Sequence, residues 1–298
     1  MLTMLISVFT VITVYVTMMA GGSLNCSVSV SATEMPPITA KAQIPTFRAS
    51  FFTSFAKSSE ARKNNIKLAA RSLNNVMVGA NEEFSFNKTV GDRTEKRGYQ
   101  TAKIIVAGKF VEGVGGGVCQ VSTTLYNAVL LAGLKVSEYH AHSLPVNYVA
   151  PSFDAMVNSG SSDLRFINDT HSPVIIKTHI NGERLCVEIY GEKTNARYER
   201  VSEITGEIEP PTEQVIVDVN GEYPDVFKGE RKVICYGKKG YTSRGKIRKI
   251  VNGKVVWEKV IRSDLYNAQR AVIVEGTAER KEMPLAGNDF MPTALIRR

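Results

Sequence analysis

One cysteine, two histidines and an aspartate follow one another in the order of a nucleophile, a base and an orienting carboxylate. Cys119 comes first, then His140 and His142, then Asp154. In thiol enzymes an imidazole activates the sulfur, and a carboxylate holds that imidazole in the right tautomer and orientation. We therefore predict Cys119 as the nucleophile, His142 as the base and Asp154 as the orienting group. His140 stays open as an alternative base, because residues two apart on a strand share one face.

A glycine-rich loop leads into Cys119. After it, apolar residues recur at helical spacing over residues 121–132, which predicts a buried helix with the thiol at its N-terminus. Unpaired N–H groups and the helix dipole favour an anion there, so the thiol is expected to ionise more easily. The glycines allow backbone N–H groups to approach a substrate oxygen, and a nearby amide side chain is a further candidate donor. The candidate binding residues are Gly115, Gly116, Gly117, Gln120 and His140.

Each of these residues also has an ordinary structural interpretation. A cysteine at the start of a buried helix often only fills space, and a histidine is often a hydrogen-bonded core or surface residue. We interpret His171 and His179 in that way. Cys119, His140 and His142 could also supply three ligands to zinc, with water as the fourth. Their spacing is not that of a common zinc module, so we predict no metal and no cofactor.

The order of the expected elements predicts an α+β fold. One central helix, ahead of several short strands with turns between them, indicates a helix packed on a mostly antiparallel sheet. A second, amphipathic helix is expected over residues 59–76. The expected strands cover residues 48–55, 102–106, 135–139, 145–148, 164–166, 174–178 and 184–190.

The N-terminal segment indicates export. Residues 1–20 carry no charged side chain, and twenty helical residues span about 30 Å, the thickness of a bilayer core. Residues 1–32 are therefore predicted to be a signal peptide or an N-terminal membrane anchor. Residues 33–58, which contain three prolines, are interpreted as a linker to an α+β domain over residues 59–198. Residues 281–298 are expected to form a flexible tail.

The charge changes sign in the C-terminal third of the chain. Residues 201–227 hold seven acidic and no basic residues, whereas residues 228–262 hold twelve basic residues against two acidic ones. We interpret residues 199–227 as an acidic linker and residues 228–280 as a small basic all-β module with a hairpin turn at Asn252-Gly253. The net charge of +8 favours acidic polymers as partners, although lysines that merely solvate a thin β module would give the same composition.

The sequence around Cys119 resembles the signature of the VanW family over about residues 60–192. One departure is Ser152, since a glycine is expected shortly before Asp154. The residues that carry the resemblance are the run Gly-Gly-Gly-Val-Cys-Gln-Val-Ser-Thr-Thr-Leu-Tyr-Asn-Ala from Gly115 to Ala128, Phe84, Phe86, Gly91, Gly98 and Tyr99 upstream, and His142, Tyr148, Asp154, Asp163, Asn168 and Tyr190 downstream.

Two other resemblances are more limited. A cysteine at a helix start, with histidine and aspartate on the strands that follow, is similar to the arrangement of transglutaminase-like and papain-like thiol enzymes. The C-terminal module resembles the extracellular module named for its five glycines, which is linked to adhesion and to amino-sugar polymers. Gly240, Gly245, Gly253 and Gly276 carry that match.

These resemblances imply an exported cell-envelope protein, anchored in the membrane through residues 1–20 or secreted to the cell wall. It is expected to bind, and could modify, peptidoglycan or teichoic acid. The alternative is a Cys-His-Asp hydrolase or transpeptidase that acts on amide bonds of wall peptides. No nucleic acid is expected as a partner, because an exported chain seldom meets any. Whether Cys186 and Cys235 form a disulfide stays open.

Overall fold

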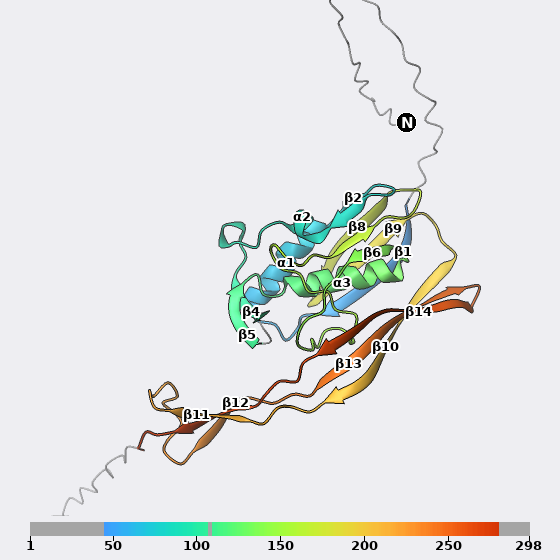
Figure 1. Cartoon of the computed structure of the whole chain (residues 1–298). Coiled ribbons are helices and arrows are strands. Elements are labelled where there is room, and N and C mark those ends of the chain that lie inside the picture. The colour runs from blue at the N-terminus through green and yellow to red at the C-terminus, as the bar shows by residue number, and fades with distance from the viewer. Residues whose placement is uncertain (1–44, 107–108, 280–298) are drawn as a thin grey trace, which may run out of the picture. The chain divides into compact units, whose positions relative to one another are not determined.

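The computed structural model describes residues 45–106 and 109–279 (Figure 1). The signal peptide or anchor expected over residues 1–32 and the tail expected over residues 281–298 lie outside these residues. Within the described part of the chain, no helix is both long and apolar enough to cross a membrane.

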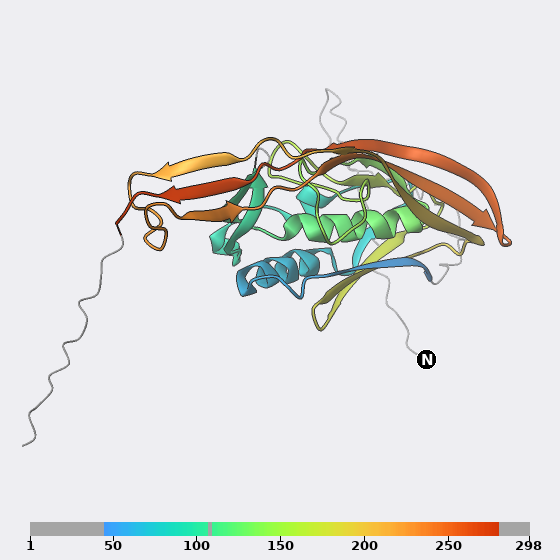
Figure 2. The ribbon, with the colours of Figure 1, turned by 90° about the horizontal axis from the view of Figure 1, so that it is seen from below.

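A four-stranded antiparallel sheet is the base of the first domain. Its strands lie in the order β1-β9-β8-β2, and helices α1 and α3 pack on one face (Figures 1 and 2). On that face Val187 and Ile189 are fully buried, whereas Phe52 and Met77 on the opposite face are exposed. The sheet therefore has one covered and one open face. The elements are β1 (Thr46–Ser54), α1 (Glu60–Leu73), β2 (Val76–Val78), α3 (Val118–Leu131), β8 (Val174–Asn181) and β9 (Arg184–Gly191).

Both helices form where apolar residues recur at helical spacing. Ser59 caps α1 by accepting a hydrogen bond from the backbone N–H of Arg62. The helix expected over residues 59–76 ends earlier, because Asn75 has a left-handed φ of 62° and β2 follows directly. The central helix is buried along nearly its whole length, and Gly133 turns the chain after it with a φ of 73°.

Two smaller sheets and two short helices complete the first domain. One sheet has the order β3-β7-β6, and β4 and β5 form a hairpin that leads into the glycine loop. Residues 145–148, expected as a strand, form a loop in which Pro145 has no N–H for a ladder, so that prediction is wrong. The elements are β3 (Glu83–Ser85), α2 (Phe86–Val90), η1 (Glu95–Arg97), β4 (Thr101–Val106), β5 (Lys109–Val114), β6 (Lys135–Glu138) and β7 (Arg165–Ile167).

The C-terminal region consists of two three-stranded sheets. One has the order β10-β13-β14 and is antiparallel, and the other has the order β11-β15-β12 with β11 parallel to β15. The turn between β13 and β14 lies at Asn252 (φ 52°) and Gly253 (φ 75°), as the sequence predicts for a tight hairpin. The elements are β10 (Ala196–Ile208), β11 (Gln214–Asp218), β12 (Arg231–Cys235), β13 (Gly240–Val251), β14 (Lys254–Tyr266) and β15 (Val272–Gly276).

The acidic stretch is not a linker. Most of β10 and all of β11 lie within residues 199–227, and β10 pairs with the basic strand β13 along its length. Glu203 lies 2.7 Å from the ammonium group of Lys246, and Glu209 lies 2.6 Å from that of Lys239. The acidic and basic stretches are therefore strand partners, which neutralise part of each other's charge within the sheet.

The linker expected over residues 33–58 is corrected in the same way. Its residues 46–54 form β1, which pairs with β9 and so belongs to the folded domain. The strand expected over residues 48–55 is thus confirmed, and the linker was extended too far into the folded domain. The α+β class is confirmed: few helices pack on mostly antiparallel sheets, and the C-terminal region is β-rich.

Candidate thiol site

Cys119 lies in the first turn of α3, directly after the glycine loop. Gly117 precedes the helix with a φ of 110°, a conformation that favours glycine. A Cβ atom on Gly116 would lie 2.7 Å from the carbonyl oxygen of Lys103, so only glycine fits there. The buried amide of Asn65 donates to the Gly116 carbonyl at 3.0 Å and ties the loop to α1. These contacts fix where α3 begins and therefore where the sulfur lies.

Polar side chains of α3 hold the segment that carries Asp154. Ser122 Oγ donates to the carbonyl of Ala155 at 2.6 Å, and Thr123 Oγ1 accepts from the N–H of the same residue at 2.9 Å. Asn127 Nδ2 donates at 2.7 Å to the carbonyl that precedes Asp154. A buried helix carries these polar residues because they satisfy the backbone groups on both sides of the aspartate.

His142 and Asp154 form a buried pair. The imidazole Nδ1 lies 2.6 Å from Oδ2 of Asp154, and the backbone N–H of His142 donates to the same oxygen at 2.7 Å. The two side chains are 5% and 1% exposed. With Nδ1 on the carboxylate, Nε2 is left for Cys119, whose thiol interacts with this imidazole. The Cys119 sulfur also lies 3.3 Å from the carbonyl oxygen of Val157.

The pKa values of these groups shift toward an ion pair. Burial raises the pKa of the Cys119 thiol, but His142, the Val157 carbonyl contact and the charge of Arg93 together bring it below its ordinary value. Burial lowers the pKa of His142, yet Asp154 and the thiol raise it to about 9. Burial also raises the pKa of Asp154, and His142 and Arg262 bring it below its ordinary value. Relative to isolated side chains, the arrangement therefore favours the thiolate, imidazolium and carboxylate forms.

Two residues of β14 contact the other oxygen of Asp154. Tyr266 Oη donates to Oδ1 at 2.5 Å, and Arg262 Nη2 lies 3.4 Å from the same atom. Arg262 Nη1 also donates to the Asp154 carbonyl at 2.6 Å. The guanidinium is 1% exposed and forms a second ion pair with Asp264 at 2.7 Å. The carboxylate that orients His142 is thus held from both sides, and one side comes from the C-terminal region.

Ser152, the departure from the family pattern, has a φ of 60°, where glycine is favoured. Its N–H donates to Tyr266 Oη at 2.9 Å, and its hydroxyl hydrogen-bonds to Ser243 Oγ at 2.7 Å. A Cβ atom on Gly245 of β13 would lie 2.7 Å from the Ser152 carbonyl oxygen. Strands β13 and β14 therefore stabilise this turn, which needs no glycine of its own.

The other candidate base and the candidate amide donor lie elsewhere. His140 Nε2 is 3.0 Å from Oε1 of Glu138, so His140 is partnered away from the sulfur. Gln120 Nε2 donates to Thr53 Oγ1 at 3.1 Å and to the Ser54 carbonyl at 2.9 Å. Both amide hydrogens of Gln120 are used in the core, and the donor role expected for it is corrected.

The alternative zinc site is not assembled either. It would require Cys119, His140 and His142 to face one point, but the two imidazoles turn to different carboxylates. Residues two apart would share a face on a strand, whereas both histidines lie in the loop after β6. Their two imidazoles are therefore not held on one face.

Sequence reasoning missed four residues of the site. Arg93 helps to lower the pKa of Cys119 through its charge. Burial and the charges of Cys119 and Asp154 raise the pKa of Tyr148, so its phenol keeps its proton near the sulfur. Tyr148 had a signal in the family resemblance. No sequence signal pointed to Arg93. None pointed to Arg262 or Tyr266 either, because these two lie over a hundred positions beyond Asp154.

A cleft of about 460 Å³ lies between α3, β6 and the sheet β10-β13-β14. Tyr139, Tyr198 and Trp257 are among the residues that line it, and none of the three thiol-site residues does. The guanidinium of Arg262 stacks 4.7 Å from the ring centroid of Tyr139. Arg262 therefore contacts both Tyr139 of the cleft wall and Asp154 of the thiol site.

The comparison with known families decides the kind of domain. The family model described as "VanW like protein" matches residues 61–190, which include Cys119, His142 and Asp154. Residues 61–190 are a VanW-like region. The resemblance stated from the sequence is thus confirmed, and the match ends before β14, so Arg262 and Tyr266 lie outside it.

Two curated relatives match the chain in part. It is 42% identical over 152 residues to "Uncharacterized protein YoaR" of Bacillus subtilis (strain 168), which covers 51% of this chain and 50% of that protein. It is 28% identical over 134 residues to "Vancomycin B-type resistance protein VanW" of Enterococcus faecalis (strain ATCC 700802 / V583), covering 43% and 49%. The chain spans about half the length of these relatives.

Two solved structures are similar to a smaller part of the chain. One is titled "Crystal structure of HP0197-G5"; the match covers 28% of this chain and 100% of that chain, at 19% identity and a TM-score of 0.15. The other, "IgA1 Protease G5 domain structure", is matched over 30% and 96%, at 18% identity and a TM-score of 0.19. Both titles name a G5 domain.

Proposed function

We propose that the VanW-like domain is a thiol enzyme for acyl transfer, with Cys119 as nucleophile, His142 as acid and base, and Asp154 as orienting group. The observation that carries the proposal is the 2.6 Å contact between His142 Nδ1 and Asp154, next to a thiol that interacts with the same imidazole. A buried ion pair adds little net stability compared with apolar residues of the same size. Chemistry therefore accounts for this arrangement better than packing does.

The proposed reaction begins with attack of the Cys119 thiolate on the carbonyl carbon of an amide. A C–S bond forms, and the C–N bond breaks as His142 gives its Nε2 proton to the leaving amine. Water, or a second amine, then attacks the thioester carbonyl and gives a proton to His142, and the C–S bond breaks to release the acyl product and restore the Cys119 thiolate. The Tyr148 phenol and the first turn of α3 are candidate donors to the oxyanion.

Arg262 and Tyr266 act as positioning residues in this proposal. They contact Asp154 and, in the described structure, share no hydrogen bond with Cys119. A carboxylate held by two further donors keeps a fixed position when the imidazole changes charge. The C-terminal region would then complete the site rather than only lie beside it.

We place the proposed substrate in the cell wall. One relative is a vancomycin resistance protein by name, and residues 1–20 have the composition of an export signal or membrane anchor. The proposed partners are peptidoglycan or teichoic acid, with amide bonds of wall peptides as the reacting groups. The protein would act outside the cytoplasm, either anchored through residues 1–20 or secreted.

The test uses purified peptidoglycan fragments with the wild-type protein and Cys119→Ser. Mass spectrometry should detect a hydrolysed or transferred peptide, and an acyl adduct on Cys119, only with the wild type. Cys235→Ser is the matched control and should leave the products unchanged, since Cys235 lies in β12, outside the site. If the fragments bind but neither product nor adduct forms, the chain is a wall-binding protein and the enzyme proposal is wrong.

A further inference from the structure

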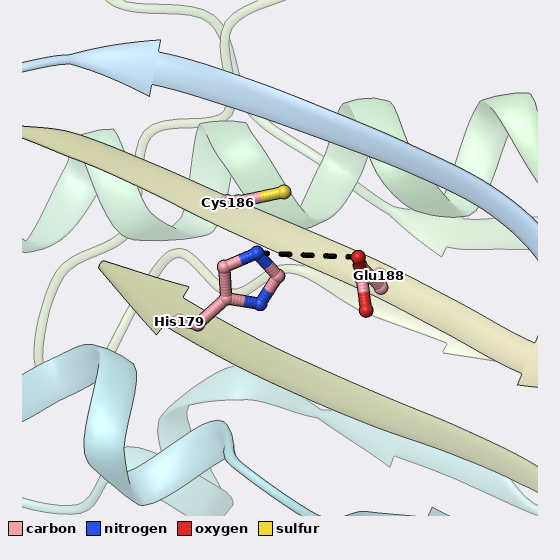
Figure 3. Close-up of side chains that lie close together, drawn as sticks. All are labelled: His179, Cys186 and Glu188. Carbon is pink, nitrogen blue, oxygen red and sulfur yellow. Dashed lines mark ion pairs between the residues drawn. The ribbon is translucent and has the colours of Figure 1, made fainter. Parts of the chain in front are cut away.

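We propose that the open face of the four-stranded sheet carries a metal site made by His179, Cys186 and Glu188. Figure 3 shows the three side chains together on strands β8 and β9. Their donor atoms, one from each residue, all lie within 4.8 Å of one another. The site is separate from the thiol site, and it does not depend on the function proposed above.

The sheet register brings these donors together. His179 on β8 lies opposite Cys186 on β9, and Glu188 follows two residues later on the same strand. Residues two apart on a strand share a face, so all three side chains leave the sheet on its open side. His179 Nε2 is 3.9 Å from Oε1 of Glu188, the contact drawn in Figure 3.

The distances suit a tetrahedral metal ion after small rotations. Zinc bonds of about 2.0–2.3 Å place neighbouring ligand atoms roughly 3.5 Å apart, so the donors need to approach by about 1 Å. The His179 side chain is 51% exposed and that of Glu188 is 23% exposed, which leaves room for such movement. Imidazole, thiolate and carboxylate are the ligand types that zinc and cobalt accept.

The surroundings both support and oppose a cation. Tyr190 Oη donates to Oε2 of Glu188 at 3.0 Å, which leaves Oε1 toward His179 and orients the carboxylate as an outer-shell partner would. Lys177, whose ammonium lies 4.8 Å from the Tyr190 ring centroid, adds a positive charge to the same face and weakens binding. The three ligands leave a fourth position for water, as in metal sites that are open to solvent.

Cys186 is available as a ligand. It is a free thiol, so the disulfide with Cys235 that the sequence left open does not form in the described structure. Zinc and cobalt bind cysteine as the thiolate, so a metal ion would displace the proton of this thiol on binding.

The experiment is a cobalt titration of the full chain in a Cys119→Ser background, after treatment with a chelator. One equivalent of Co²⁺ should produce a thiolate-to-cobalt charge-transfer band, and Zn²⁺ should remove it. Cys186→Ser should abolish the band, and His179→Ala and Glu188→Gln should each weaken binding by at least about tenfold. Cys235→Ser and His171→Ala are the matched controls and should bind as the parent does.

Two results would overturn the proposal: no charge-transfer band in the parent, or a band that survives Cys186→Ser. Circular dichroism of each variant shows whether it is folded, and these side chains are partly exposed, so loss of fold is not expected. Because Cys119 is absent from every protein in the series, neither result bears on the thiol site.

Discussion

Arg262→Met removes the buried guanidinium that joins Asp154 to Asp264. The arginine side chain is 1% exposed, lies 2.7 Å from Asp264 and donates at 2.6 Å to the Asp154 carbonyl. Breaking a buried ion pair by removing one partner costs about 3–5 kcal/mol, because the other charge stays buried without its partner. For a folded unit of this size each kcal/mol lowers Tm by about 2–4 °C, so we expect a loss of about 6–20 °C.

Thermal unfolding of the full chain, followed by circular dichroism, measures this loss. Arg248→Met is the matched control: it removes an exposed pair with Glu258 on the same sheet, and exposed pairs contribute about 0–1 kcal/mol. Its Tm should therefore fall by at most about 4 °C. If Arg262→Met and Arg248→Met unfold at the same temperature, Arg262 does not stabilise Asp154, and the contact assigned between the first domain and the C-terminal region is wrong.

Three further predictions concern the same structure. By NMR, the ring of His142 should titrate near its pKa of about 9, above the ordinary histidine value. Asp154→Asn should move that titration to lower pH, because it removes a negative charge that favours imidazolium. An ordinary pKa for His142 in the wild type would refute the pairing of His142 with Asp154. Gly245→Ala should lower the unfolding free energy by about 1–3 kcal/mol in a denaturant titration, since its Cβ would lie 2.7 Å from a backbone oxygen; an unchanged midpoint would show that the strand can move away. Glu203→Gln should cost only about 0.2–1 kcal/mol by the same assay, because its pair with Lys246 is partly exposed, and a larger loss would mean that the charge pairs of the sheet are structural.

Local patterns predicted the centre of the fold. The spacing of apolar residues after Cys119 gave the buried helix, and Asn252-Gly253 gave the hairpin turn, because both signals lie within a few residues. The strand β10 was not predicted, because its acidic residues suggest a solvated linker until the basic strand β13 is known to lie beside it. Strand pairing between distant segments leaves no local signal.

The site could be predicted only as far as the order of its residues. Cys119, His142 and Asp154 were proposed from that order, and the structure places the last two in contact. The choice between His140 and His142 required the loop that turns one imidazole to Glu138 and the other to Asp154. The contacts of β14 could not be predicted at all, since they join segments that no motif connects.

The pH dependence of Cys119 alkylation tests the central claim most directly. Iodoacetamide labelling followed by peptide mass spectrometry gives the rate at each cysteine, with Cys186 in the same protein as an internal reference whose pKa is raised by burial. We predict that Cys119 reacts quickly near pH 6, where an ordinary thiol of pKa about 8.5 is almost fully protonated, and that His142→Ala slows this reaction strongly while His140→Ala does not. A Cys119 that reacts no faster than Cys186 at pH 6, or whose rate is unchanged in His142→Ala, would contradict it.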